Sequence, residues 1–143
     1  MIQLEALTLG YGQQILLDHV SANLDGGGLI ALLGRNGSGK STLLRATAGL
    51  GTIKSGRILL AGKDLAELRP EELARTVSFV TTEKVRIPNL KCRDVVALGR
   101  APYTNWVGRL QPQDREIVAK SLALLDMSAY AERTMDQMSD GEC

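Results

Sequence analysis

Long hydrophobic runs, cysteines and an excess of charge of one sign are missing, or nearly so, from this 143-residue sequence. Its longest uninterrupted apolar stretch, residues 29–33, has five residues, whereas a membrane-spanning helix needs roughly 20. We therefore expect no transmembrane segment, and the N-terminus lacks the positively charged start and apolar stretch of a secretory signal. The 17 basic and 16 acidic side chains leave a net charge of +1, which gives no support for a nucleic-acid-binding domain.

The two cysteines, Cys92 and Cys143, are too few for a disulfide framework and lack the spacing of a metal site. We therefore expect the protein to reside in the reducing cytosol. What the sequence does have is the composition of an ordinary globular protein, with 44% hydrophobic and 23% charged residues. This apolar content and small net charge exclude an intrinsically disordered chain. The length fits one modest domain.

The first part of the chain is predicted to be rich in strands. Apolar and polar residues alternate over residues 2–9, which is typical of a half-buried strand, and spaced apolar residues continue over 15–24. The wholly apolar run at 29–33 is bounded by glycines. It is predicted to be a strand buried on both faces, as in a parallel sheet covered by helices. Shorter strands are expected at residues 57–60 and 77–80.

Helices and turns are predicted from glycine and proline signals. A helix over residues 40–48, with Gly49 as its C-terminal cap, comes directly after a glycine-rich loop. Another helix begins at Pro70, whose fixed dihedral suits a first helical position, and Ser55-Gly56 before it is predicted to be a turn. The last part is expected to be helical at residues 93–98 and at 114–125, where Ile117, Val118, Leu122 and Leu125 share one face.

A glycine-rich motif carries the strongest functional signal. It fits the pattern G-x-x-x-x-G-K-[ST] of the phosphate-binding P-loop and lies between a predicted strand and helix: Gly34, Arg35, Asn36, Gly37, Ser38, Gly39, Lys40 and Ser41. The glycines let backbone N–H groups point at phosphate oxygens, and the following helix presents its positive end to the same anion. Lys40 supplies positive charge for the β- and γ-phosphates, and the Ser41 hydroxyl is a ligand for Mg²⁺. The motif predicts binding of a nucleoside triphosphate with Mg²⁺.

Residues 32–44, which contain this motif, closely resemble the Walker A region of ABC transporter ATPase subunits. The resemblance implies that the nucleotide is ATP and that Thr42 also contributes to its binding. It implies a role for Tyr11 as well, because the family places an aromatic residue at this distance before the loop, where it stacks on adenine. The sequence contains no guanine-reading N-K-x-D motif.

Residues 138–142 resemble the family signature L-S-G-G-Q in a variant form. Ser139 and Gly141 match it, whereas Asp140 replaces a glycine and Glu142 replaces the usual glutamine. In the family this segment contacts the γ-phosphate held by the opposite subunit. The resemblance therefore implies that Ser139 and Gly141 bind nucleotide in trans.

The residues that the family uses to hydrolyse ATP are only partly present in this sequence. At the position of the family's Q-loop glutamine, which senses Mg²⁺ and the attacking water, this sequence has either Thr82 or Glu83. No run of four apolar residues followed by Asp-Glu is present, so the Walker B motif is missing. Phosphoryl transfer depends on the acidic groups of that motif, and we expect the chain to bind ATP without hydrolysing it.

The predicted strand at residues 29–33 lacks the neighbouring strands that it has in the family's core. Its apolar edge is therefore open, and we expect poor solubility or self-association.

Residues 87–103 resemble the helical subdomain of importers for iron-siderophores, haem and cobalamin. The resemblance implies a groove that receives a coupling helix from membrane permease subunits, with Tyr103 and Trp106 as candidates for its rim. It also implies a homodimer of ATPase subunits, peripheral on the cytoplasmic face of the membrane and linked indirectly to a periplasmic or surface substrate-binding protein.

The histidine of this sequence, His19, precedes the P-loop, so it cannot be the family's switch histidine. We expect it to be structural.

The resemblance implies an α/β fold, the N-terminal part of a P-loop NTPase of the ABC ATPase type. An antiparallel β subdomain and an incomplete RecA-like core are expected over residues 1–85, a helical subdomain over 86–137 and the signature motif over 138–143. Two alternatives remain open: a truncated, non-hydrolysing nucleotide-binding protein, and a soluble ABC ATPase without a transport role. ATPases of the latter kind usually carry tandem cassettes or long coiled-coil insertions, and neither is found in this sequence.

Overall fold

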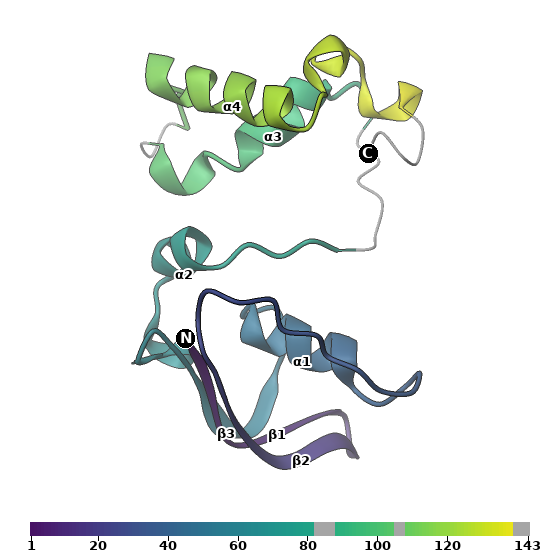
Figure 1. Cartoon of the computed structure of the whole chain (residues 1–143), viewed down its shortest axis with the longest axis vertical. Helices are drawn as coiled ribbons and strands as arrows, with labels where there is room; N and C mark the ends of the chain where they lie inside the picture. Colours follow the sequence, from purple (N-terminus) through teal and green to yellow (C-terminus); the bar gives the residue numbers. More distant parts are fainter. Residues whose placement is uncertain (82–87, 105–107, 139–143) are drawn as a thin grey trace. The chain divides into compact units, whose positions relative to one another are not determined.

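Two structural units, Met1–Phe79 and Val80–Cys143, make up this chain. The computed structural model describes residues 1–81, 88–104 and 108–138 (Figure 1). The first unit contains a sheet and two α-helices, and the second unit contains helices. The domain boundaries expected from the sequence, after residues 85 and 137, stay predictions.

The first unit is built on an antiparallel sheet with the strand order β2-β1-β3-β4. Its central strand β1 (Ile2–Tyr11) lies between β2 (Gln14–Leu24) and β3 (Ile53–Leu60), and β4 (Lys63–Asp64) forms a short edge. The strands predicted at residues 2–9 and 15–24 are confirmed, because alternating apolar residues suit a sheet with one covered face.

A register shift between β1 and β3 corrects one prediction. The sequence predicted a turn at Ser55-Gly56, but both residues lie inside β3, which begins at Ile53. The φ of Gly56 is +79°, and a Cβ atom there would lie 2.3 Å from the carbonyl oxygen of Ala6 on β1. The register between β1 and β3 shifts at this point. The glycine thus allows the two backbones to approach closely while β3 continues as one strand, a role that local sequence does not distinguish from a turn.

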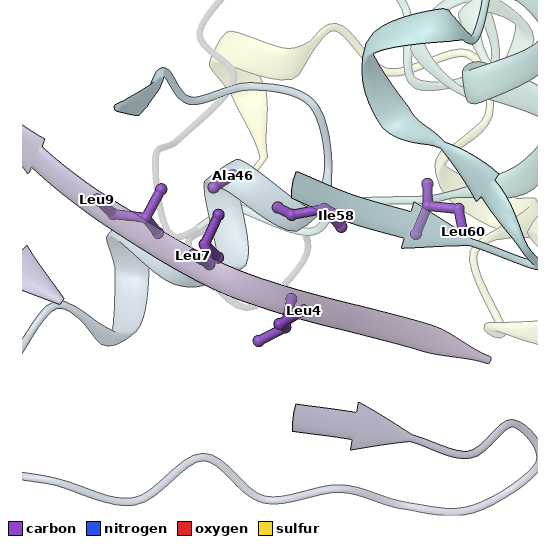
Figure 2. Packing of buried hydrophobic residues seen from close by; sticks show 6 residues of the cluster. All are labelled: Leu4, Leu7, Leu9, Ala46, Ile58 and Leu60. Carbon is purple, nitrogen blue, oxygen red and sulfur yellow. The ribbon is translucent and has the colours of Figure 1, made fainter. Parts of the chain in front are cut away.

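The core of the first unit joins the sheet to α1 (Lys40–Thr47), the helix predicted over residues 40–48. Gly49, the predicted cap, follows the helix with a φ of +72°, in the left-handed conformation that ends many helices. Figure 2 shows the buried cluster, which is contributed by β1, α1 and β3: Leu4, Leu7, Leu9, Ala46, Ile58 and Leu60. This packing fixes α1, and with it the end of the P-loop, against β1.

Two predicted strands are absent from the described part of the chain. Residues 29–33 have no strand structure, and Leu29 and Leu33 are 100% and 88% exposed rather than buried. Residues 77–80 are likewise irregular, and Val80 is 94% exposed. A strand buried on both faces needs hydrogen-bonded neighbours on its two edges. No strand among residues 1–81, 88–104 and 108–138 pairs with either segment, so both predictions are wrong for the structure of this chain.

The three remaining α-helices that the structure describes have 7, 7 and 13 residues. In the first unit α2 (Pro70–Thr76) begins at Pro70, as predicted. The second unit contains α3 (Cys92–Leu98) and α4 (Pro112–Leu124), which confirm the two helices predicted there. Single turns of 3-10 helix cover Leu65–Glu67, Ala101–Tyr103, Ser128–Tyr130 and Met135–Gln137. None of the helices in the described ranges has both the length and the apolar character needed to cross a membrane.

The second unit has a small core of its own, formed by Cys92, Val118, Leu122 and Met135. Val118 and Leu122 confirm half of the predicted apolar face of α4, whereas Ile117 is half-buried and does not belong to this core. Leu125 does not belong to that face, because α4 ends at Leu124 and the Leu125 side chain is 72% exposed. Leu125 keeps the helical spacing from Val118 and Leu122, but it is the C-cap residue, where the helical conformation has already ended.

The start of α4 is stabilised by a buried carboxylate. Asp114 is only 5% exposed. It accepts hydrogen bonds from the backbone N–H of Gln111 at 2.9 Å and from the Nε of Arg100 at 2.9 Å. These two donors, the backbone N–H first, hold the pKa of the Asp114 carboxyl below its usual value of 3.8. The carboxylate therefore joins the helix start to the segment that follows α3.

We expect the substitution Asp114→Asn to destabilise the second unit at neutral pH. Since folding lowers the pKa of this carboxyl, its stabilising contribution is complete above the ordinary pKa and is lost as the pH falls below about 4. The destabilisation by Asp114→Asn should therefore shrink in acid. Thermal unfolding between pH 7 and pH 3 measures it, with the exposed Asp136 as Asp136→Asn for control. An equal effect at both pH values would contradict the assignment.

Candidate nucleotide-binding site

The P-loop of the first unit is closed into a ring by the side chain of Lys40. This residue is the first of α1, and its Nζ donates hydrogen bonds to the carbonyl oxygens of Gly34 at 2.9 Å and Arg35 at 2.7 Å. An ammonium group has three N–H donors, so one donor remains beyond these two. The ring thus presents a positive charge together with a remaining donor, which is the chemistry that a phosphate chain requires.

Two glycines give the loop its curvature. Gly37 and Gly39 have φ values of +80° and +86°, in the left-handed region that other residues rarely adopt. A Cβ atom on Gly39 would also lie 3.3 Å from the Cγ of Leu17 on β2. Because Gly39 is the N-cap and has no side chain, the first-turn N–H groups of α1 are not covered by a capping side chain. The loop and helix start together have the backbone geometry that anion sites at helix N-termini share.

The charges around this site favour an anionic ligand. The first turn of α1 contains no acidic residue that would repel an anion at the P-loop. Ser41 is exposed at the second helical position, next to Lys40, where its hydroxyl is accessible to a metal ion beside the phosphates. No group of three or more histidine, cysteine, aspartate or glutamate side chains is placed to hold a metal within the described residues.

The structure places Tyr11 beside the P-loop although 31 residues separate it from Thr42. Tyr11 is the last residue of β1 and is 61% exposed. Its hydroxyl lies 3.4 Å from the Oγ1 of Thr42 in the first turn of α1. A hollow of about 370 Å³ opens here, and its lining residues include Tyr11, Thr42, Arg45 and Lys54 together with residues 50–52. This volume lies within the usual range of small-molecule sites.

Five of the predicted site residues belong to the part of the chain that the structure does not describe. Thr82, Glu83, Trp106, Ser139 and Gly141 lie outside the described residues.

Two other residues of the sequence analysis lie elsewhere on the surface. Tyr103 is 48% exposed in the second unit, and the guanidinium of Arg100 lies 4.1 Å from its ring centre. His19 lies on β2 with an exposed side chain, and its Nδ1 is 2.7 Å from a carboxylate oxygen of Asp18. The lining residue Lys54 was not predicted, because a single lysine at the start of a strand belongs to no motif.

The sequence profile of the ABC transporter family matches residues 17–143, which include the whole P-loop. The chain belongs to this family. Members of the family bind nucleotide. This agrees with the P-loop that the Lys40 side chain closes. The expected fold class is also confirmed, since the antiparallel sheet and helices of this cassette correspond to the N-terminal part of an ABC ATPase.

Relatives of this chain include a protein named for siderophore transport. The cassette is 37% identical over 142 residues to an uncharacterized ABC transporter ATP-binding protein of Methanocaldococcus jannaschii, covering 99% of this chain and 49% of that protein. It is 33% identical over 141 residues to a probable siderophore transport system ATP-binding protein of Bacillus subtilis, covering 99% and 51%. It therefore spans about half the length of the curated relatives that it matches.

Solved cassettes share the fold. A nucleotide-free ATP-binding cassette from an ABC transporter matches with a TM-score of 0.80 at 25% identity, over 99% of this chain and 60% of that chain. A bacterial ABC transporter cassette with a dimeric structure matches with a TM-score of 0.79 at 26% identity, over 99% and 65%. The agreement covers nearly all of the chain.

Proposed function

We propose that this cassette is the nucleotide-binding part of an importer ATPase that binds MgATP at residues 34–42. In the assembled transporter, ATP hydrolysis would be coupled to uptake of a metal chelate such as an iron-siderophore. The observation that carries nucleotide binding is the ring that Lys40 closes around the P-loop. The substrate class is supported by relatives named for siderophore, petrobactin, achromobactin and iron-hydroxamate transport.

The geometry suggests how one nucleotide would be held. Its phosphates would accept hydrogen bonds from the loop, from the start of α1 and from the remaining N–H of Lys40. The Ser41 hydroxyl would hold Mg²⁺, which supplies neutralisation of the phosphate charge. Tyr11 would stack on the base, since its exposed ring stands beside the first turn of α1.

The proposed transport cycle also needs a second ATPase subunit and membrane permease subunits. In a homodimer, Ser139 and Gly141 of one subunit would contact the γ-phosphate bound by the other. The helical unit would dock on membrane permease subunits at the cytoplasmic face, and the permease would link the ATPase to a substrate-binding protein. Since the sequence contains no Walker B pattern, we propose that residues 1–143 bind ATP without turnover.

Titration of the chain with a fluorescent ATP analogue tests nucleotide binding directly. We expect saturable binding with one site per chain, displacement by unlabelled ATP, and weaker binding when Mg²⁺ is removed by a chelator. A parallel measurement of phosphate release should give no rate above that of buffer. Absence of saturable binding would contradict the proposed function.

Tyr11 provides a test of the base contact. The substitution Tyr11→Ala should weaken ATP binding by about 1–3 kcal/mol, the usual contribution of one base stacked on an aromatic ring. Tyr11→Phe keeps the ring and should bind ATP nearly as well, because the hydroxyl contact to Thr42 is long at 3.4 Å. Isothermal titration with ATP and with inorganic tripolyphosphate separates the base from the phosphates. Equal losses for both ligands would exclude stacking.

A further inference from the structure

The tip of the β1–β2 hairpin extends beyond the rest of the sheet. The pairing of β1 with β3 ends at Leu9, which faces Ile53. Beyond that point, Gly10 and Tyr11 pair only with β2. A two-stranded ribbon is marginally stable in water when nothing else supports it. The Tyr11 ring therefore stands on the least supported part of the sheet.

One side chain ties this tip back to β3. Lys54, the second residue of β3, donates a hydrogen bond from its Nζ to the carbonyl oxygen of Gly12 in the hairpin turn, at 2.5 Å. The contact spans 42 residues of sequence. A hydrogen bond from an ammonium group is stronger than one between neutral groups. It crosses the gap left where the β1–β3 ladder ends.

The same residue lines the hollow beside the P-loop. Lys54 and Tyr11 both border the space of about 370 Å³, and Thr42 closes it from α1. We propose that Lys54 is a positioning residue for nucleobase binding, because it anchors the hairpin tip and so holds the Tyr11 ring over this hollow. This inference rests on the proposed function, since it concerns how the base of the bound nucleotide is held.

The role of Lys54 differs from that of Lys40. The ammonium of Lys40 bonds to the P-loop itself, whereas that of Lys54 bonds to the hairpin turn. Loss of Lys54 leaves the Tyr11 ring less ordered in the free protein, and ordering it on binding then reduces affinity. A ligand without a base needs no such ordering. The effect should therefore fall on ATP and spare tripolyphosphate.

The substitution Lys54→Met, which keeps most of the aliphatic stem, tests this inference in the full chain. We expect the Kd for MgATP to rise about fivefold, as for loss of one hydrogen bond, while that for Mg-tripolyphosphate stays nearly unchanged. Lys54→Arg keeps a cationic donor and should restore most of the ATP affinity. Lys63→Met removes an exposed lysine from β4 in the same unit and should change neither Kd.

A double-mutant cycle completes the test. In a Tyr11→Ala background, Lys54→Met should have no further effect on the Kd for ATP, because the ring that it positions is gone. Equal weakening of both ligands, or an unchanged Kd for ATP in Lys54→Met, would overturn the positioning role while leaving the proposed function intact. If the unsubstituted chain binds neither ATP nor tripolyphosphate, the proposed function fails and this inference fails with it.

Discussion

Replacing Lys40 by alanine is expected to abolish MgATP binding. The substitution removes the charge that a triphosphate needs, and it also removes the two hydrogen bonds that close the loop, to Gly34 at 2.9 Å and Arg35 at 2.7 Å. Hydrogen bonds to charged groups contribute about 1.5–3 kcal/mol each. Loss of the phosphate contact and of the preformed loop together should weaken binding by at least about 100-fold.

The matched control for this experiment is Lys120→Ala, which removes the same charge from an exposed position of α4 in the second unit. Titration with a fluorescent ATP analogue should give saturation for this control and none for Lys40→Ala. Circular dichroism of both variants should match the unsubstituted chain, because Lys40 contributes no apolar group to the core. A Kd for Lys40→Ala close to that of the control would contradict the P-loop assignment.

The second large effect is expected from Gly56→Ala in β3. Alanine at a φ of +79° costs about 1–2 kcal/mol in any surroundings. Here its Cβ would also lie 2.3 Å from the carbonyl oxygen of Ala6 and 2.5 Å from that of Glu5, both backbone atoms of the neighbouring strand. Separating the strands to relieve this contact disturbs the central ladder, which adds about 1–3 kcal/mol. We expect a total destabilisation of about 2–5 kcal/mol.

Gly62→Ala separates the two causes. Gly62 has a similar φ of +82°, but a Cβ there meets no atom within 4 Å. This variant should therefore show only the conformational cost of about 1–2 kcal/mol. Urea unfolding followed by far-ultraviolet circular dichroism measures both variants. Equal midpoints for Gly56→Ala and Gly62→Ala would show that the close approach of β3 to β1 contributes nothing.

Local sequence patterns were sufficient to predict the elements whose form depends mainly on their own residues. The alternation over residues 2–9 predicted β1, since one face of that strand is covered by α1. The P-loop motif and the helix after it were identified because glycine, lysine and serine at fixed spacing serve one local geometry. Pro70 marked the start of α2 for the same reason.

Contacts between distant residues decided the rest. The apolar run at residues 29–33 was predicted to be a buried strand, yet Leu29 is fully exposed, because burial requires neighbouring strands that a local pattern cannot supply. The local sequence around Gly56 is typical of a turn. The tertiary structure places this residue inside β3, close to the backbone of Ala6 on β1. The sequence motif determined the phosphate site, whereas tertiary structure brought Tyr11 to α1 and Lys54 to the hairpin turn. Those contacts join residues 31 and 42 positions apart, and no local spacing encodes them.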